Sequence, residues 1–333
     1  MSESNSVTVF TLGGTISANR ADVGAPRLTG AQVVAGLAVS PDITVEVRDF
    51  RRVPSSSLTF EDLAELAEQV GKAVEAGSGV VVVQGTDTLE ETAFLLDLTC
   101  RTPRPIVVTG AMRRPDLPGA DGPGNLASAI AVAADPDCRD LGVLAVFADE
   151  IHAARHVHKA HTTSVATISS PGFGPLGVVV EGEPRVLFRP ARPTVPRPLR
   201  LREAVRVGLV TLSLGDRGEL LDCVDDRFDG LVVAAFGGGH VPSWLVEPLG
   251  ALAERMPVVL ASRTGAGPLL ARTYRGPGSE TALLDRGLIS AGFLDPAKAR
   301  LLLHALLADG VDRSAITESF AAMAWRGSTS QSS

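Results

Sequence analysis

The sequence predicts an α/β fold built on mostly parallel sheets. Short apolar runs, such as Val80–Val83 and Val143–Phe147, alternate along the chain with segments of helical periodicity. These runs are apolar at every position, which is typical of strands buried on both faces. The chain has 333 residues, of which 45% are hydrophobic and 21% charged, so it can bury the core of one large domain or of two smaller ones.

The first elements are predicted from their boundary residues. A strand at Val7–Leu12 ends at two glycines. Thr59 is the expected N-cap of a helix, with Asp62 in a capping box and Gly77 as its stop. The elements that follow are a strand at Val80–Val83, a helix at Leu89–Thr99 with Glu90 and Glu91 in its first turn, a strand at Ile106–Thr109, a helix after Asp121 and a strand at Val143–Phe147.

A proline-rich segment divides the chain. Residues 189–202 read RPARPTVPRPLRLR, and their prolines exclude a regular helix. We therefore expect an N-terminal catalytic domain at 1–189, a linker at 190–203 and a C-terminal α/β domain at 204–333. The elements expected after the linker are strands at Val207–Leu212, Leu231–Ala235 and Val258–Ser262, and helices near Pro242, from Asp295-Pro296 and after Asp312.

The composition excludes several classes of function. A net charge of −7 argues against nucleic-acid binding, which needs a concentrated basic face. The first residues lack the basic segment followed by an apolar run that is typical of a signal sequence, and Val7–Leu12 is too short to span a membrane. A cytoplasmic location is therefore expected. No glycine loop has the spacing of a nucleotide-binding motif, and no cofactor is expected. The three cysteines are interpreted as small buried hydrophobic residues in a reducing compartment.

Two loops that follow predicted strands could carry chemistry. They are Gly13-Gly14-Thr15-Ile16-Ser17 and Gln84-Gly85-Thr86-Asp87-Thr88. Ligands bind beyond the carboxyl ends of parallel strands, and a hydroxyl beside permissive backbone N–H groups supplies a nucleophile together with oxyanion donors. The alternative is that both are tight turns in which threonine caps a helix.

Four histidines and one lysine cluster further along the chain, at His152, His156, His158, His161 and Lys159. On a helix the first two histidines would share a face, as zinc ligands do, but no carboxylate stands among them in a zinc-hydrolase pattern. Ordinary polar loop residues are therefore the preferred interpretation, and no metal is expected. A buried lysine near a threonine could accept a proton, whereas an exposed loop lysine would have no such role.

Taken together, the motifs resemble those of the bacterial-type L-asparaginases. The first loop, with the preceding Leu12, is similar to the first family signature, and residues 84–92, QGTDTLEET, resemble the second, HGTDTMEET. Residues 110–113 (GAMR), with 120–126, are similar to the family's GAMR…ADGP-x-NL stretch. The resemblance implies two flavodoxin-like domains with mostly parallel sheets, the N-terminal one larger. It also implies a homotetramer of intimate dimers, with sites completed by a neighbouring chain.

By position, the resemblance implies a role for individual residues. Thr15 matches the nucleophile, and Thr86 and Asp87 match the second catalytic threonine and the aspartate that binds the substrate's α-amino group. Lys159 matches the lysine paired with that second threonine. The remaining matches, all to substrate-binding positions, are Ser55 and Ser56, Glu280 from across the dimer and His240 where the family often has an asparagine.

The sequence departs from the family pattern at three further places. Leu12 replaces a threonine, which we expect to change packing, and Gln84 replaces a histidine that we expect to orient the loop. The catalytic tyrosine that follows the nucleophile in the family is missing, since no tyrosine lies between Ser17 and Gly36. The chain's single tyrosine, Tyr274, lies six residues before Glu280 and is the candidate substitute, unless water or Lys159 serves Thr15.

The sequence therefore predicts an asparaginase that works through a threonine acyl-enzyme without a cofactor. A glutaminase or mixed amidase is the alternative among enzymes. Because the tyrosine is missing, a catalytically silent asparagine- or aspartate-binding protein is the alternative from another class.

Overall fold

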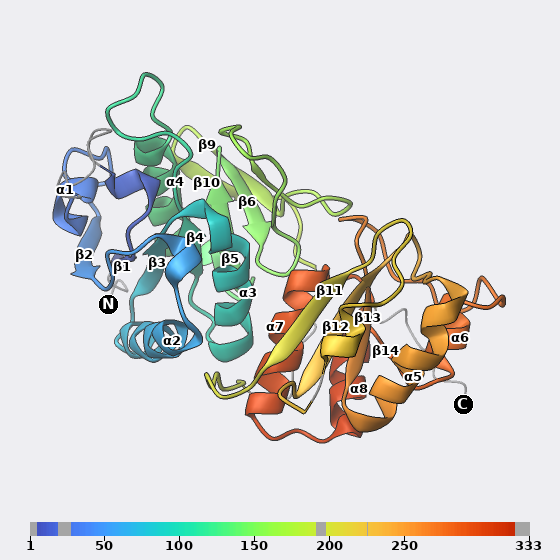
Figure 1. Ribbon diagram of the computed structural model, residues 1–333. Coiled ribbons are helices and arrows are strands. Elements are labelled where there is room, and N and C mark those ends of the chain that lie inside the picture. Colours follow the sequence, from blue (N-terminus) through green and yellow to red (C-terminus); the bar gives the residue numbers. More distant parts are fainter. Residues whose placement is uncertain (1–4, 19–27, 191–197, 225, 324–333) are drawn as a thin grey trace, which may run out of the picture. The chain divides into compact units, whose positions relative to one another are not determined.

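The chain forms two compact units, Met1–Arg192 and Pro193–Ser333 (Figure 1). The computed structural model describes residues 5–18, 28–190, 198–224 and 226–323. The predicted linker spans the division between the units, although its residues 191–197 lie outside the described ranges. Both units are α/β, and the predicted fold class is confirmed.

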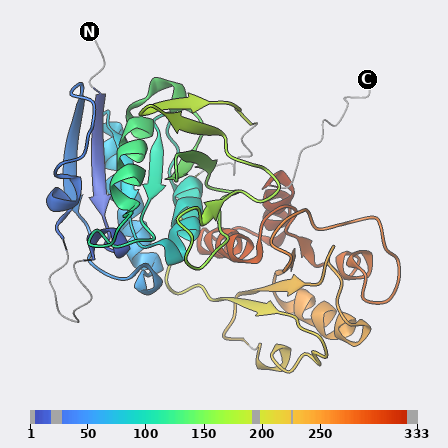
Figure 2. The ribbon, with the colours of Figure 1, turned by 90° about the horizontal axis from the view of Figure 1, so that it is seen from above.

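The first unit is built on an eight-stranded sheet. Its strands are β1 (Asn5–Thr11), β2 (Ile43–Asp49), β3 (Gly79–Val83), β4 (Ile106–Thr109), β5 (Val143–Phe147), β6 (Glu150–Ala153), β9 (Gly177–Val180) and β10 (Glu183–Val186). The order is β10-β9-β6-β5-β4-β3-β1-β2, and Figure 2 shows β2 outermost at its edge. A separate pair contains β7 (His158–Lys159) and β8 (Ile168–Ser169).

The strands from β2 to β5 are parallel and have the order 2-1-3-4-5 of a flavodoxin-like sheet. The chain reverses its direction of winding between β1 and β3, so ligands are expected at the carboxyl ends of these two strands. The carboxyl ends of β1 and β3 carry the two threonine loops. The parallel part of the sheet thus brings together two loops whose threonines, Thr15 and Thr86, lie 71 residues apart in the sequence.

The antiparallel strands β6, β9 and β10 were not predicted from the sequence. Tight turns at Ala148-Asp149 and Glu181-Gly182, with positive φ at all four residues, reverse the chain into β6 and β10. These φ angles are those of the two-residue turn that joins the strands of a β-hairpin, and such turns usually contain Asn-Gly or Asp-Gly. Ala148 and Glu181, the first residues of these turns, rarely adopt positive φ, so the sequence did not indicate the hairpins.

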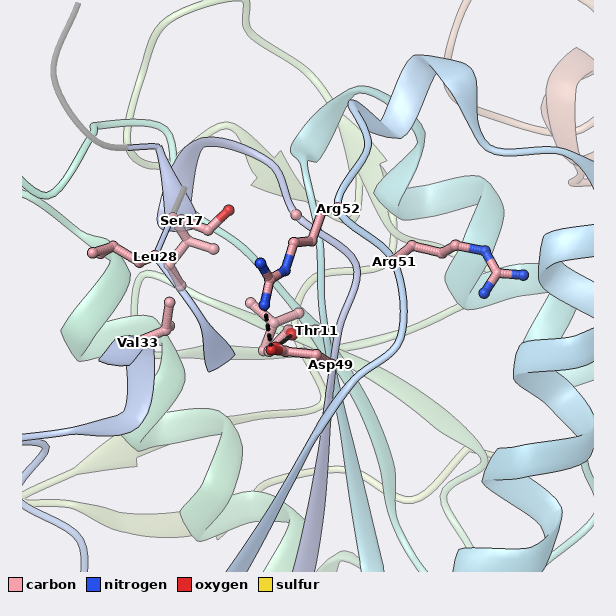
Figure 3. A pocket seen from close by; sticks show the side chains of 10 residues that line it. Thr11, Ser17, Leu28, Val33, Asp49, Arg51 and Arg52 are labelled. Carbon is pink, nitrogen blue, oxygen red and sulfur yellow. Dashed lines mark hydrogen bonds and ion pairs between the residues drawn. The ribbon is translucent and has the colours of Figure 1, made fainter. Parts of the chain in front are cut away.

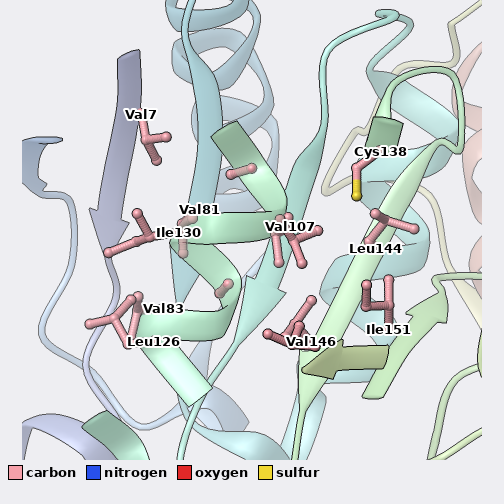
Figure 4. Packing of buried hydrophobic residues seen from close by; sticks show 14 of the residues in the cluster. Val7, Val81, Val83, Val107, Leu126, Ile130, Cys138, Leu144, Val146 and Ile151 are labelled. Carbon is pink, nitrogen blue, oxygen red and sulfur yellow. The ribbon is translucent and has the colours of Figure 1, made fainter. Parts of the chain in front are cut away.

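Helices cover both faces of the first sheet. They are α1 (Gly30–Val34), α2 (Phe60–Glu75), α3 (Leu89–Thr99) and α4 (Gly122–Ala134). Leu126 and Ile130 of α4 pack on Val7, Val81 and Val107, which project from one face of neighbouring strands (Figure 4). The predicted capping box of α2 is confirmed, because Thr59 and Asp62 bond each other's backbone N–H groups.

The second unit has a smaller, entirely parallel sheet with its strands in sequence order. They are β11 (Val207–Thr211), β12 (Gly230–Ala235), β13 (Val258–Ser262) and β14 (Ile289–Ser290). Its helices are α5 (Val246–Arg255), α6 (Glu280–Leu284), α7 (Pro296–Ala308) and α8 (Arg313–Met323). Asp295 caps α7 as predicted, and its carboxylate also bonds the fully buried ammonium of Lys298 at 2.6 Å.

The interpretation of the cysteines was right for two of the three. Cys100 and Cys138 are buried, and burial raises the pKa of their thiols to about 11 and about 12 respectively. Cys223 is exposed, so it is not a small core residue. It is the last residue of a short 3-10 helix, Leu221–Cys223, in which Leu221 is the buried residue.

Candidate active site

Glycines let the two threonine loops meet in backbone contact. Gly14, which follows β1, has φ 91°, and a Cβ placed on it would lie 2.3 Å from the backbone nitrogen of Gly85, which follows β3. A Cβ on Gly85 would in turn lie 2.8 Å from Ser55 Oγ. Since no side chain fits at this crossing, the glycines of both motifs are required by packing.

Thr15 begins a single 3-10 turn that ends at Ser17. Ile16 packs into the core, and the Ser17 hydroxyl donates to the Gly14 carbonyl at 3.1 Å, so the turn is held on both sides of Thr15. The Thr15 side chain is partly exposed and makes no hydrogen bond to any residue that the structure describes. A hydroxyl placed in this way is open to a substrate.

A small pocket lies beside the first loop (Figure 3). Its polar wall is the carboxylate of Asp49, which accepts from the Thr11 hydroxyl at 2.7 Å, from Gly30 N at 2.8 Å and from Arg52 at 2.7 Å. The Thr11 hydrogen bond first, and then Arg52, lower the pKa of Asp49. This carboxylate ties the end of β1 to the start of α1. This arrangement could not be predicted from the sequence, because its members come from three separate segments.

Lys159 reaches the second loop from β7. Its ammonium lies 2.7 Å from Asp87 Oδ1, and its side chain is only 17% exposed. Asp87 itself is 63% exposed, so one side of the carboxylate remains open to solvent. The Thr86 hydroxyl is buried and donates to the sulfur of Met112 at 3.3 Å, a weak acceptor. The structure thus joins Lys159 to Asp87, while the hydroxyl of Thr86 is directed to Met112.

The third loop, which follows β4, is held by Asp121 at the start of α4. Its carboxylate accepts the backbone N–H groups of Met112 and Arg113 at 2.9 and 2.8 Å. Asn125 donates to the Gly110 carbonyl at 3.0 Å and accepts the Ala148 N–H at 2.9 Å. The two motif halves at 110–113 and 120–126 therefore form one rigid turn that places Met112 beside Thr86.

Gln84 and Leu12 show what the departures from the family signatures do. The buried Gln84 side chain donates to the Gly85 carbonyl at 3.3 Å, so it braces the second loop. Leu12 is buried in the core, as expected for a packing change.

Of the two serines, Ser55 is buried and Ser56 is exposed. The Ser55 hydroxyl faces Gly85 and has no hydrogen-bond partner among the described residues, while its carbonyl accepts from Thr88 at 3.0 Å. An unpaired hydroxyl at this depth remains available to a ligand.

The histidines do not form the helical pair considered from the sequence. His152 lies on β6, fully buried, and its Nδ1 bonds Ser170 Oγ at 3.0 Å; His158 lies on β7. Burial lowers the pKa of His152 to about 4. His152 is therefore a core residue of a strand and not a loop residue. In the described part of the chain, no three His, Cys, Asp or Glu side chains come together as a metal ion would require.

Three further predicted residues form a cluster in the second unit. Glu280, which begins α6, is fully buried; one oxygen accepts the backbone N–H groups of Thr273 and Tyr274 at 2.9 Å each, and the other lies 3.6 Å from His240 Nε2. The Tyr274 ring is half exposed and packs edge-on against the His240 ring at 4.7 Å. Burial by itself would raise the pKa of Glu280, but these hydrogen bonds and His240 lower it.

Comparison with known proteins decides the family. The model described as "Asparaginase, N-terminal" matches residues 6–192, and that of the "Glutaminase/Asparaginase C-terminal domain" matches residues 206–320. The chain belongs to the asparaginase family. It is thus an amidohydrolase of the L-asparaginase type, as the sequence motifs predicted.

Relatives of this asparaginase-family protein align over most of their length. A "Probable L-asparaginase" of Deinococcus radiodurans is 41% identical over 80% of this chain and 83% of the relative. An "L-asparaginase" of Bacillus licheniformis is 32% identical over 91% of this chain and 95% of the relative. A "Glutaminase-asparaginase" of Pseudomonas aeruginosa is 32% identical over 90% of this chain and 85% of the relative. No helix in the described ranges is long and apolar enough to cross a membrane.

Proposed function

We propose that this family member hydrolyses the side-chain amide of L-asparagine to L-aspartate and ammonia through a Thr15 acyl-enzyme. The observation that carries the proposal is the backbone contact between the Thr15 loop and the loop of Thr86 and Asp87, with Lys159 paired to Asp87 at 2.7 Å. A partly exposed hydroxyl thus stands on one loop, and a carboxylate paired with an ammonium stands on the loop that touches it, at the point where the winding of the sheet reverses. We expect the enzyme to act in the cytoplasm.

The reaction proceeds in two halves. The Thr15 hydroxyl attacks the amide carbon and gives up its proton, and the C–N bond then breaks as the nitrogen leaves with a proton as ammonia. Water attacks the resulting ester, releases aspartate and returns the proton to Thr15. Backbone N–H groups of the glycine loops are the candidates to stabilise the oxyanion. Lys159 and Thr86 transfer protons between Thr15 and the leaving nitrogen.

Binding of the substrate's amino-acid end is assigned to the groups around this point. The open side of Asp87 suits the α-ammonium, and the Ser55 and Ser56 hydroxyls suit the α-carboxylate, since Ser55 Oγ is buried and has no hydrogen-bond partner in the part of the chain that the structure describes. The α-carbon is then held at a set distance from Thr15, so side-chain length decides whether the amide carbon reaches it.

We expect asparagine to be preferred over glutamine for this reason. A misplacement of about 1 Å costs on the order of a hundredfold in rate, so kcat/KM for glutamine should be lower by roughly that factor. The measurement is ammonia release from each amide in a coupled assay. Equal values of kcat/KM would contradict the proposal and favour a mixed amidase, as the name of the Pseudomonas relative would suggest. Thermal stabilisation by aspartate without any ammonia release would favour a silent binding protein.

We also propose that the enzyme is a homo-oligomer, a dimer of dimers, whose sites are shared between chains. The support comes from the second-unit cluster, in which the buried carboxylate of Glu280 has one oxygen that accepts no hydrogen bond from the described residues and lies near His240, against which Tyr274 packs. In this proposal the cluster completes the site of a neighbouring chain. Glu280 and His240 contact the substrate, and the Tyr274 side chain serves Thr15 as its acid–base group in place of the missing tyrosine.

Tyr274→Phe should lower kcat about a hundredfold, the size expected for losing a positioned acid–base group. If Tyr274 acts on the Thr15 of another chain, mixing Tyr274→Phe with inactive Thr15→Ala chains should restore activity. Half of randomly formed pairs are mixed and half of their sites carry both residues, so about a quarter of wild-type activity should return. An unchanged rate for Tyr274→Phe would refute its role, and light scattering that finds an active monomer would refute the shared site.

A further inference from the structure

Glu90 lies in the first turn of α3 and contacts the strand that carries Lys159. It stands three residues after Asp87, and the 3-10 turn at Thr86–Thr88 leads directly into α3, so the two carboxylates share one side of the segment. Glu90 Oε2 lies 2.7 Å from His158 Nδ1 and accepts the backbone N–H of Lys159 at 3.2 Å. Its side chain is 13% exposed.

β7 is a short strand that follows the buried Val157, and the Ala160 N–H to Thr167 carbonyl hydrogen bond extends its pairing. It contains two residues, and within the described ranges its strand partner is the two-residue β8, outside the eight-stranded sheet. A strand pair of this size is not stable by itself. The two carboxylates hold it at two points, because Glu90 binds the backbone of Lys159 while Asp87 binds its ammonium.

The cost of burying Glu90 is offset in this position. Two donors reach one carboxylate oxygen, and the N-terminus of α3 favours a negative charge. Both bonds go to the same oxygen, so a glutamine in this place could still accept them, whereas an alanine could not. Glu90→Gln therefore removes the charge and keeps the contact to β7, whereas Glu90→Ala removes both.

We propose that Glu90 is a positioning residue that holds the Lys159 ammonium against Asp87. The inference rests on the proposed role of Lys159 in proton transfer. Glu90 does not contact the reacting atoms; it sets the location of β7, and β7 sets the location of Lys159. Loss of Glu90 should therefore act on turnover through Lys159.

Kinetics test this dependence. Glu90→Ala should lower kcat by about tenfold to a hundredfold with KM changed little, as expected when a supporting contact is lost. Glu90→Gln should retain kcat within about fivefold, since an amide oxygen gives a weaker but similar bond. In a Lys159→Met background Glu90→Ala should have no further effect, because residues that act as a unit are not additive. Glu61→Ala is the matched control, as Glu61 is an exposed acid in the first turn of α2.

Chemical acetylation gives a readout that does not depend on activity. The chain has three lysines, and the other two serve as internal references: the Lys72 side chain is 66% exposed and Lys298 is 1% exposed. In the wild type Lys159 should be acetylated more slowly than Lys72. In Glu90→Ala its rate should rise toward that of Lys72, and in Glu90→Gln it should remain low.

The outcomes separate this inference from the function on which it rests. Unchanged acetylation of Lys159 in Glu90→Ala, or an equal loss of kcat in the wild-type and Lys159→Met backgrounds, would overturn the positioning role. A fully active Lys159→Met would overturn the role of Lys159 instead, and acetylation would then still show whether Glu90 holds it. A melting temperature measured for each variant identifies any that fails to fold.

Discussion

Replacing Thr15 by alanine is expected to reduce kcat by at least about a thousandfold, because loss of an activated nucleophile removes the covalent route altogether. The fold should not change, since Thr15 is partly exposed and its side chain has no hydrogen-bond partner among the described residues. Steady-state ammonia release measures the rate, and thermal stabilisation by aspartate measures binding, which should stay close to that of the wild type.

Thr15→Ser is the matched control, since it keeps the hydroxyl and should retain part of the activity. A quenched reaction with asparagine should leave one aspartyl group on the peptide that contains Thr15, and none in Thr15→Ala. An alanine variant that keeps more than about a thousandth of the wild-type rate would show that another group is the nucleophile.

Replacing Lys159 by methionine should lower kcat by about a hundredfold to ten-thousandfold, the range for a positioned acid–base group. Methionine keeps much of the apolar stem of the lysine, which is mostly buried, while the charge beside Asp87 is lost. The effect on stability should be small, because Asp87 is 63% exposed and water can replace its partner.

Lys72→Met is the control for loss of a lysine, since Lys72 pairs with Glu68 on the exposed side of α2. It should have wild-type kcat and KM. If Lys159→Met keeps wild-type turnover while folding normally, the proton must move by another route, and the water-assisted alternative would be favoured.

Much of the fold could be predicted because its signals are local. The strands β4, β5 and β13 and the helix α3 begin and end where apolar runs and capping residues indicated. The strands that were missed depend on distant partners. β6 and β10 follow turns whose first residues, Ala148 and Glu181, are unusual at positive φ, and the two-residue β7 pairs with β8 and contacts α3.

The candidate site, too, could be predicted from the sequence only in part. Motif order and spacing were sufficient to select Thr15, Thr86, Asp87 and Lys159, and the model matches confirm the family. They could not show that Thr86 faces Met112, or that Glu90 anchors β7. Hydrogen bonds between segments some 26 to 69 residues apart leave no periodic trace in a sequence.

By itself, then, the sequence determined the fold class, the family and the residues with chemically suitable side chains, because strand pattern, capping and glycine loops are properties of neighbouring residues. Only the tertiary structure decided which of these residues meet. The parallel order β2-β1-β3-β4-β5 brings the loops after β1 and β3 together, and glycines at the crossing allow backbone contact there. Lys159 reaches Asp87 because a short strand outside the main sheet is held by a carboxylate of α3.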